Sequence, residues 1–128
     1  MAQVHLSSLD VSDCDNAFTA ADAGSVLRAH TCSATRAESH GAFVTGGATL
    51  ALDACDLSDC AVHGACGQDA GSVLNARGST FARNGCTGVM VGGGAHADVA
   101  ECKVESNKVA GVLASVRLGE CVLVPLRR

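Results

Sequence analysis

The residues best suited to chemistry in this sequence crowd the stretch GATLALDACDLSDCAVHGACGQDA, residues 47–70. Cys60, His63 and Cys66 follow one another at three-residue intervals. Thiolate and imidazole groups at such spacing can bind zinc, with His40 as a further donor. The same cysteines could instead form disulfides, or pack as small apolar side chains in a core. The elements that position these residues decide between the three interpretations.

Acidic and basic residues alternate at a regular interval elsewhere in the chain. Asp13, Arg36, Asp59 and Arg83 are followed by Ser106, in steps of 23, 23, 24 and 23 residues. Two carboxylates near a basic residue can perform acid–base chemistry, as in glycoside hydrolysis. The regular interval equally predicts a ladder of opposite charges on neighbouring strands.

Composition limits the kind of core that can hold these residues. The chain has 128 residues, of which 48% are hydrophobic and 2% aromatic, with no Trp or Tyr. A core of Ala, Val, Leu, Cys and Gly favours thin layers of stacked side chains. The formal net charge of −4 gives no footprint for nucleic acid or an anionic membrane. The first residues, MAQVHLSSLDVSD, lack the pattern of a secretory signal, so we expect a reducing compartment despite the eight cysteines.

Four columns of small or apolar residues recur about every 23 residues. They contain, in chain order, Val4, Leu27, Leu50, Leu74, Ala97 and Val116; Leu6, Ala29, Leu52, Ala76, Val99 and Leu118; Leu9, Cys32, Cys55, Ser79, Cys102 and Cys121; and Val11, Ala34, Leu57, Phe81, Val104 and Leu123. Alternation with period 2 predicts short β-strands, and the two-residue interruption predicts a bend between them. A further short strand opens with a glycine in four repeats, at Gly41, Gly64, Gly88 and Gly111.

Three short strands in about 23 residues predict one coil of a right-handed parallel β-helix. We therefore expect an all-β domain over residues 1–128, with about six coils stacked at about 4.8 Å. Neither end of the sequence shows an evident cap, although Pro125 could blunt the last strand. This predicts that the chain is part of a longer protein, or that its ends stack on another chain.

The repeated pattern (C/S)-x-(apolar)-x-x-(N/C)-x-x-x-G-x-(apolar)-(apolar), with Asn84 and Asn107 at its asparagine position, covers nearly the whole chain. It resembles the right-handed parallel β-helix repeats of pectate-lyase-like solenoids. Similar repeats occur in intracellular adaptors, including substrate-recognition parts of ubiquitin ligases, and in proteins attached to cytoskeletal assemblies. They also occur in polysaccharide lyases and hydrolases, which place carboxylates and a basic residue on an outer sheet. The resemblance implies the fold, and it leaves both classes of function open.

The repeat places six of the cysteines in two inward columns, where we expect them to pack. Cys32, Cys55, Cys102 and Cys121 share one column, and Cys14 and Cys60 share the column of Asn84. Disulfides joining Cys32 to Cys55 or Cys102 to Cys121 are an alternative with awkward geometry. We expect His40 and His63 to stack as solvated side chains, and we expect no metal and no cofactor.

Outward columns are freer to carry function, because packing does not dictate them. For Asp13, Arg36, Asp59 and Arg83 we favour an ion-pair ladder that keeps the coils in register. In the alternative, catalytic interpretation, Asp13 and Asp59 lie about 9–10 Å apart by strand spacing, within the range of an inverting pair. Arg36 stands between them, and the sequence offers no aromatic platform for a sugar.

A second outward column is apolar, and it contains Ala20, Phe43, Cys66, Met90 and Leu113. If the flanking residues of each strand point inward, these form a continuous apolar stripe, which usually marks a contact site. A register shift of one residue would reverse the assignment.

The stripe favours a non-enzymatic scaffold or adaptor that binds a protein partner through Phe43, Cys66, Met90 and Leu113. We expect it in the cytoplasm, in a larger or cytoskeletal assembly, with end-to-end stacking as a further possibility. The alternative function is a carbohydrate-binding or polysaccharide-modifying β-helix that uses the Asp/Arg column.

Overall fold

In the computed structural model, residues 3–108, 110–113, 116–118 and 122–124 are described, and they form three parallel β-sheets. We name these sheets A, B and C, in the order in which the chain first enters them. No helix among the described residues has the length and hydropathy needed to cross a membrane.

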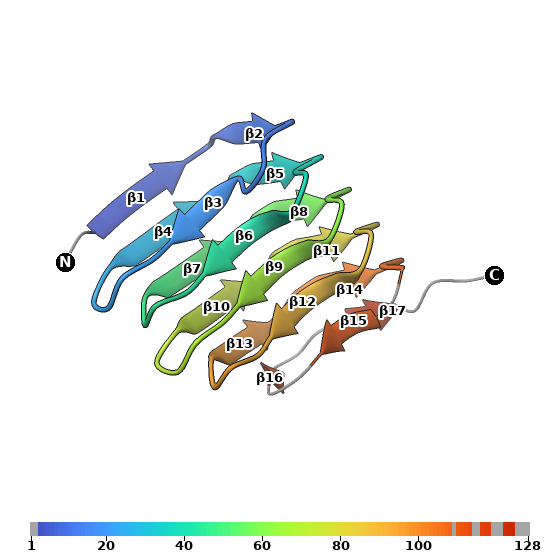
Figure 1. The fold of residues 1–128 in the computed structure, drawn as a ribbon. Coiled ribbons are helices and arrows are strands. Elements are labelled where there is room, and N and C mark those ends of the chain that lie inside the picture. The colour runs from blue at the N-terminus through green and yellow to red at the C-terminus, as the bar shows by residue number, and fades with distance from the viewer. Residues whose placement is uncertain (1–2, 109, 114–115, 119–121, 125–128) are drawn as a thin grey trace.

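Each sheet is built from parallel strands of successive coils (Figure 1). Sheet A contains β1 (Gln3–Ser7), β4 (Val26–His30), β7 (Thr49–Asp53), β10 (Val73–Arg77), β13 (His96–Ala100) and β16 (Val116–Leu118). Sheet B contains β2 (Asp10–Ser12), β5 (Ser33–Thr35), β8 (Asp56–Ser58), β11 (Thr80–Ala82), β14 (Lys103–Glu105) and β17 (Val122–Val124). Sheet C contains β3 (Phe18–Ala20), β6 (His40–Val44), β9 (His63–Gly67), β12 (Thr87–Val91) and β15 (Ala110–Leu113).

The strand register confirms the predicted repeat. Val4 pairs with Leu27, and the same column continues in register through Leu50, Leu74, Ala97 and Val116. The all-β parallel solenoid with a period of about 23 residues is therefore confirmed. The coil count is slightly below six, because sheet C has five strands and the sixth coil contributes only β16 and β17 among the described residues.

Two corners of each coil are made by single residues in the left-handed backbone region. Between sheets A and B these are Ser8, Thr31, Ala54, Gly78 and Glu101, with φ of 54–60°. Between sheets B and C they are Asp13, Arg36, Asp59, Arg83 and Ser106, with φ of 54–59°. Residues with a Cβ rarely adopt such angles. The corners stack on one another, because the N–H of Ala54 donates to Arg77 O at 2.9 Å and the N–H of Asp59 donates to Ala82 O at 3.0 Å.

The glycines of sheet C are required by close approach between coils. A Cβ on Gly64 would lie 2.8 Å from Gly88 O, and one on Gly41 would lie 2.6 Å from Gly64 O. Real Cβ atoms do not come so close to a carbonyl oxygen. The glycine that opens these strands in the sequence therefore marks a steric limit.

The core is a stack of like side chains between the three sheets. Leu50, Leu57 and Phe81 are fully buried. Val4 and Leu9 also belong to inward columns, but their side chains are 44% and 42% exposed. They lie in the first coil, at an edge of the described stack. Pro125 and Cys121 lie outside the described residues. Stacking of the ends on another chain stays a prediction.

Candidate functional site

The predicted apolar stripe lies on the outer face of sheet C, with its members in register. Phe43 pairs with Cys66, Cys66 with Met90, and Met90 with Leu113. The neighbouring Val44 points inward and is fully buried, as the prediction requires. The sequence thus located this column correctly from Phe43 to Met90, and Leu113 continues its strand register.

The first coil differs from the prediction by one residue. Thr19 pairs with Phe43, whereas Ala20 pairs with Val44 and is buried. The prediction of Ala20 in the stripe was therefore wrong. The connection between the sheet B and sheet C strands is one residue shorter in the first coil than in the second, which shifts the alignment by one position.

The stripe residues are only partly open to solvent. Phe43 and Met90 are half-buried, while Cys66, which lies between them in the register, is 1% exposed. Burial raises the pKa of the Cys66 thiol to about 11. The side chain of Leu113 lies outside the described part of the structure. The stripe therefore offers Phe43 and Met90 to a partner, and the Cys66 thiol is covered.

Aromatic rings continue the packed surface toward the start of the sheet C strands. The rings of His40 and His63 stack with centroids 5.1 Å apart and planes 7° apart, and His40 also stacks on Phe43 at 5.4 Å. His63 is 8% exposed, so the prediction that both histidines are solvated was wrong for this one. Because the coils stack closely, the side chains of His40, His63 and Phe43 form one continuous surface.

Hydrogen bonding fixes the state of His63 but leaves one atom of His40 without a partner. The backbone N–H of Thr87 donates to His63 Nδ1 at 3.3 Å, and the Thr87 hydroxyl lies 2.6 Å from the same atom. Because a backbone N–H can only donate, His63 Nδ1 is an acceptor and carries no proton. His40 Nδ1 is buried and has no partner among the described residues. Burial lowers the pKa of His40, and burial together with the adjacent His40 lowers the pKa of His63.

The zinc interpretation finds no support in the geometry. Among the described residues, no three His, Cys, Asp or Glu side chains are grouped so that they could hold a metal ion. Cys60 is buried with its Sγ donating to Ser58 O at 3.6 Å, whereas Cys66 lies on the outer face of sheet C. The Nδ1 of His63 already accepts a hydrogen bond from the Thr87 N–H. These donors therefore do not converge.

The thiols of the sheet A–sheet B corner are buried and bonded to the backbone. Cys32, Cys55 and Cys102 each donate from Sγ to the carbonyl oxygen two residues earlier, at 3.2–3.4 Å. Ser79 replaces the thiol in one coil and makes the same bond at 3.2 Å. The cysteines in the described part of the chain are free thiols, and the pKa of Cys55 is raised by burial.

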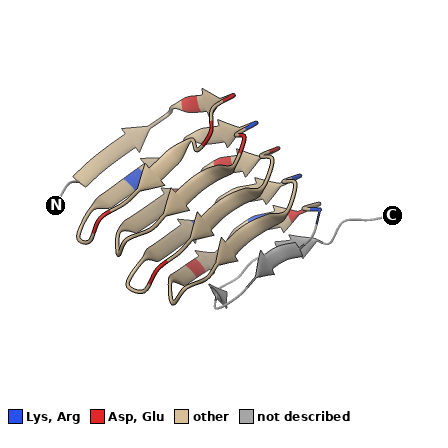
Figure 2. Ribbon diagram, viewed as in Figure 1, with Lys and Arg blue, Asp and Glu red and all other residues tan. Residues whose placement is uncertain are grey.

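The Asp/Arg column forms two separate ion pairs on the outside of the sheet B–sheet C corner. Figure 2 shows acidic and basic positions alternating from coil to coil along this corner. Arg36 donates from Nε and Nη2 to Asp13 at 3.0 and 3.1 Å, and Arg83 donates to Asp59 with the same two distances. The hydrogen bond from Arg36 lowers the pKa of Asp13, so this carboxyl holds no proton to donate at neutral pH. All four side chains are well exposed, so the pairs are solvated.

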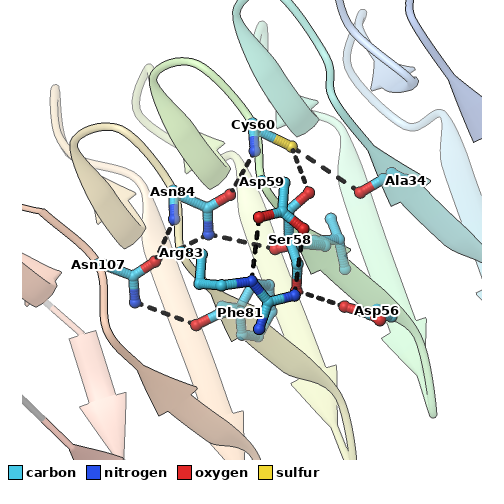
Figure 3. A network of polar contacts seen from close by, with 10 residues as sticks. Ala34, Asp56, Ser58, Asp59, Cys60, Phe81, Arg83, Asn84 and Asn107 are labelled. Atoms are coloured by element: carbon cyan, nitrogen blue, oxygen red, sulfur yellow. Dashed lines mark hydrogen bonds and ion pairs between the residues drawn. The ribbon is translucent and has the colours of Figure 1, made fainter.

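One residue further along the chain, the same corner carries a buried polar network (Figure 3). The N–H of Cys60 donates to Asn84 Oδ1 at 3.0 Å, and the N–H of Asn84 donates to Asn107 Oδ1 at 3.1 Å. The amide nitrogens of the two asparagines donate to Leu57 O and Phe81 O. The two asparagines singled out in the sequence therefore satisfy buried backbone groups of neighbouring coils.

Sheet A carries a feature that the sequence did not reveal. Its outer face holds a hollow of about 400 Å³ bordered by Arg28, Ala51 and Asn75. A second hollow of about 190 Å³ includes Asn75 and Asp98. The register His5–Arg28–Ala51–Asn75–Asp98 was present in the sequence, but its members share neither charge nor polarity. A search for columns of like residues could not find it.

Comparison with known proteins agrees with the geometry. The family model described as the right-handed β-helix region matches residues 2–121. No curated protein and no solved structure gives a significant match to the chain.

Proposed function

The chain belongs to the right-handed β-helix family, and on that premise we propose that it is a non-enzymatic scaffold that binds a protein partner through the outer face of sheet C. The observation that carries the proposal is the in-register column of Phe43, Cys66 and Met90. Aromatic and Met side chains are enriched at the cores of protein interfaces. Leu113, the next residue in the register, extends the proposed site by one coil.

The surface is held in one arrangement before any partner arrives. Phe43 is stacked on His40, which is stacked on His63, and all three lie on hydrogen-bonded strands. Side chains that are already ordered lose little conformational entropy on binding. A partner that buries Phe43 and Met90 would gain apolar contact at low cost in ordering. Its contact with the buried Cys66 would be small.

A catalytic or carbohydrate-binding role for Asp13, Arg36, Asp59 and Arg83 is less well supported. Each carboxylate is engaged by two donors of one guanidinium, and the Asp13 pKa is lowered rather than raised. A general acid needs the opposite shift. If Asp13→Asn together with Asp59→Asn removed binding to a glycan array, the carbohydrate role would replace the scaffold proposal.

We place the protein in the cytoplasm, in a reducing compartment, in association with a larger or cytoskeletal assembly. The buried thiols of Cys32, Cys55 and Cys102 support the reducing compartment, because each donates a hydrogen bond that only the reduced form can make. Measurement of their redox state after rapid alkylation in source cells tests the compartment.

The test of the interface is affinity capture under reducing conditions with quantitative mass spectrometry. The Phe43→Asp/Met90→Asp variant should lose at least tenfold of a partner that the wild type captures. The control is Val26→Asp/Val73→Asp, which places the same charges at half-buried outer positions of sheet A. A partner lost from the first variant and kept by the control supports the proposal. Equal capture by all three proteins, each with an unchanged melting temperature, contradicts it.

A further inference from the structure

The outer face of sheet A has a positive group beside its larger hollow that has no ion-pair partner among the described residues. The exposed Arg28 side chain borders the larger hollow and forms no ion pair with any described residue. Its register neighbours are His5 on β1 and Ala51 on β7, neither of which is acidic. Asp53 and His30 also line this hollow, and they pair with each other, with Asp53 Oδ2 2.9 Å from His30 Nδ1. Arg28 is therefore available to an anionic group of a ligand.

One of the outward residues that line the hollow has a small side chain. Ala51 stands between Arg28 and Asn75 in the same outward column. Both neighbours carry long or polar side chains, so the column dips at the third coil. A space next to a guanidinium and a carboxamide suits an apolar side chain of moderate size, flanked by groups that can hydrogen-bond.

A negative group stands at the far end of the same column. Asp98 follows Asn75 in the register and borders the smaller hollow, which shares Asn75 with the larger one. Asp98 makes no ion pair with a described side chain; its backbone register partner on β16 is Arg117, whose side chain lies outside the described part. Opposite charges thus stand three coils apart, about 14 Å by strand spacing.

We propose that this groove binds an extended peptide segment that carries an acidic, an apolar and a basic residue at alternate positions. Four residues of extended chain span about 13–14 Å, which matches the separation of Arg28 and Asp98. Residues at alternate positions of an extended chain face the same side. The acidic residue pairs with Arg28, the apolar residue fills the hollow over Ala51, and the basic residue pairs with Asp98.

The peptide lies across the strands of sheet A, along the axis of the solenoid. Asn75 stands beneath it between the apolar and basic positions, and its carboxamide can donate to and accept from one peptide group. This surface is separate from the stripe on sheet C, so either proposal can fail without the other.

The test is a titration of the whole chain with the blocked peptide acetyl-Glu-Thr-Val-Thr-Arg-amide, followed by backbone amide NMR. We expect saturable shifts confined to β4, β7, β10 and β13. Arg28→Glu, Asp98→Lys and Ala51→Leu should each weaken binding at least tenfold. The matched control, Arg77→Glu, changes an exposed arginine of the same sheet that does not border the groove and should change affinity less than twofold.

Two further ligands separate this proposal from its competitors. In acetyl-Glu-Val-Thr-Thr-Arg-amide the apolar residue faces away from the groove, so this peptide should bind at least tenfold more weakly. An oligogalacturonide should produce no saturable shift on sheet A. Equal affinity for the two peptides, or saturable binding of the oligosaccharide alone, overturns the proposal. So does a wild-type response to the first peptide that lies on sheet C or is absent.

Discussion

Sheets A and C present outer faces of opposite character, although the same coils build both. On sheet C, His40 stacks on both His63 and Phe43, and the outer side chains of Phe43, Cys66 and Met90 are half-buried or buried. On sheet A, Arg28 and Asn75 are exposed and a hollow opens over Ala51. The difference lies in how residue type follows the register. Where neighbouring coils carry similar outward side chains, as on sheet C, these form a continuous packed surface. Where the outward residue changes from coil to coil, as on sheet A, the face carries separate charges and a depression.

The largest effect is expected at Gly64, where an added Cβ would meet three polar atoms at 2.8–3.0 Å. Gly64→Ala places a Cβ 2.8 Å from Gly88 O and from Asn84 Nδ2. We expect a loss of about 3 kcal/mol in the free energy of unfolding, or no folded protein. Gly92→Ala is the control, because a Cβ there meets nothing within 4 Å. Chemical denaturation checks both variants, and a loss below about 1 kcal/mol at Gly64 would show that the sheet C glycines are not a steric requirement.

The second prediction compares the loss of a buried polar group with the loss of an exposed one, at the corner leading into sheet C. Asn84→Ala leaves the Cys60 N–H and Leu57 O without partners in the interior, which should cost about 2 kcal/mol. Arg83→Ala removes a solvated ion pair one residue earlier and should cost less than about 1 kcal/mol. Denaturation in urea gives both values, and the reverse order would contradict the assignment of structural and solvated columns.

The histidine stack should make stability depend on pH in a way that sheet A does not. The pKa values of folded His40 and His63 lie below the ordinary 6.5, so in the unfolded chain they bind protons at a higher pH. The free energy of unfolding should therefore be fully retained above about pH 7 and should fall as the pH decreases toward 5. The lowered pKa values of Asp13 and Asp69 act only below their ordinary 3.8, outside this range.

The double variant His40→Gln/His63→Gln should flatten this dependence, whereas His96→Gln on the exposed face of sheet A should leave it unchanged. Thermal unfolding at half-unit steps of pH measures it. An identical slope in both variants would assign the dependence to other groups.

The smallest effect concerns thiol reactivity within the stripe. With a pKa of about 11, Cys66 is roughly one part in a thousand thiolate at pH 8, and its side chain is covered. It should react with iodoacetamide much more slowly than the half-buried Cys86. Peptide mapping after timed alkylation measures the two rates. Equal rates would mean that the sheet C face opens in solution.

Inward columns could be predicted from the sequence because packing repeats the same residue type. Val4, Leu27 and Leu50 align by hydropathy, and the structure pairs them as expected. The Ala20 assignment failed because hydropathy does not reveal a connection that is one residue shorter. The left-handed corners were also out of reach, since Arg36 and Ala54 carry no local signal for positive φ.

Outward positions were predictable only where they repeat a property. The apolar column at Phe43 and the charge alternation at Asp59 both do so, and both were found. His40 and Phe43 belong to different columns, so their stacking cannot be predicted by comparing residues within one column. The groove on sheet A depends on an alanine between dissimilar neighbours, and that contrast becomes visible only in three dimensions.

Site-specific photo-crosslinking in source lysate tests most directly whether sheet C is the partner-binding face. A benzophenone amino acid replaces Phe43 in one protein and Val26, on the outer face of sheet A, in another. We predict a discrete crosslinked protein partner from position 43 that is absent from position 26 and is competed away by excess unlabelled wild type but not by Met90→Asp. No discrete partner from position 43, or the same partner crosslinked equally from both positions, would contradict the scaffold proposal.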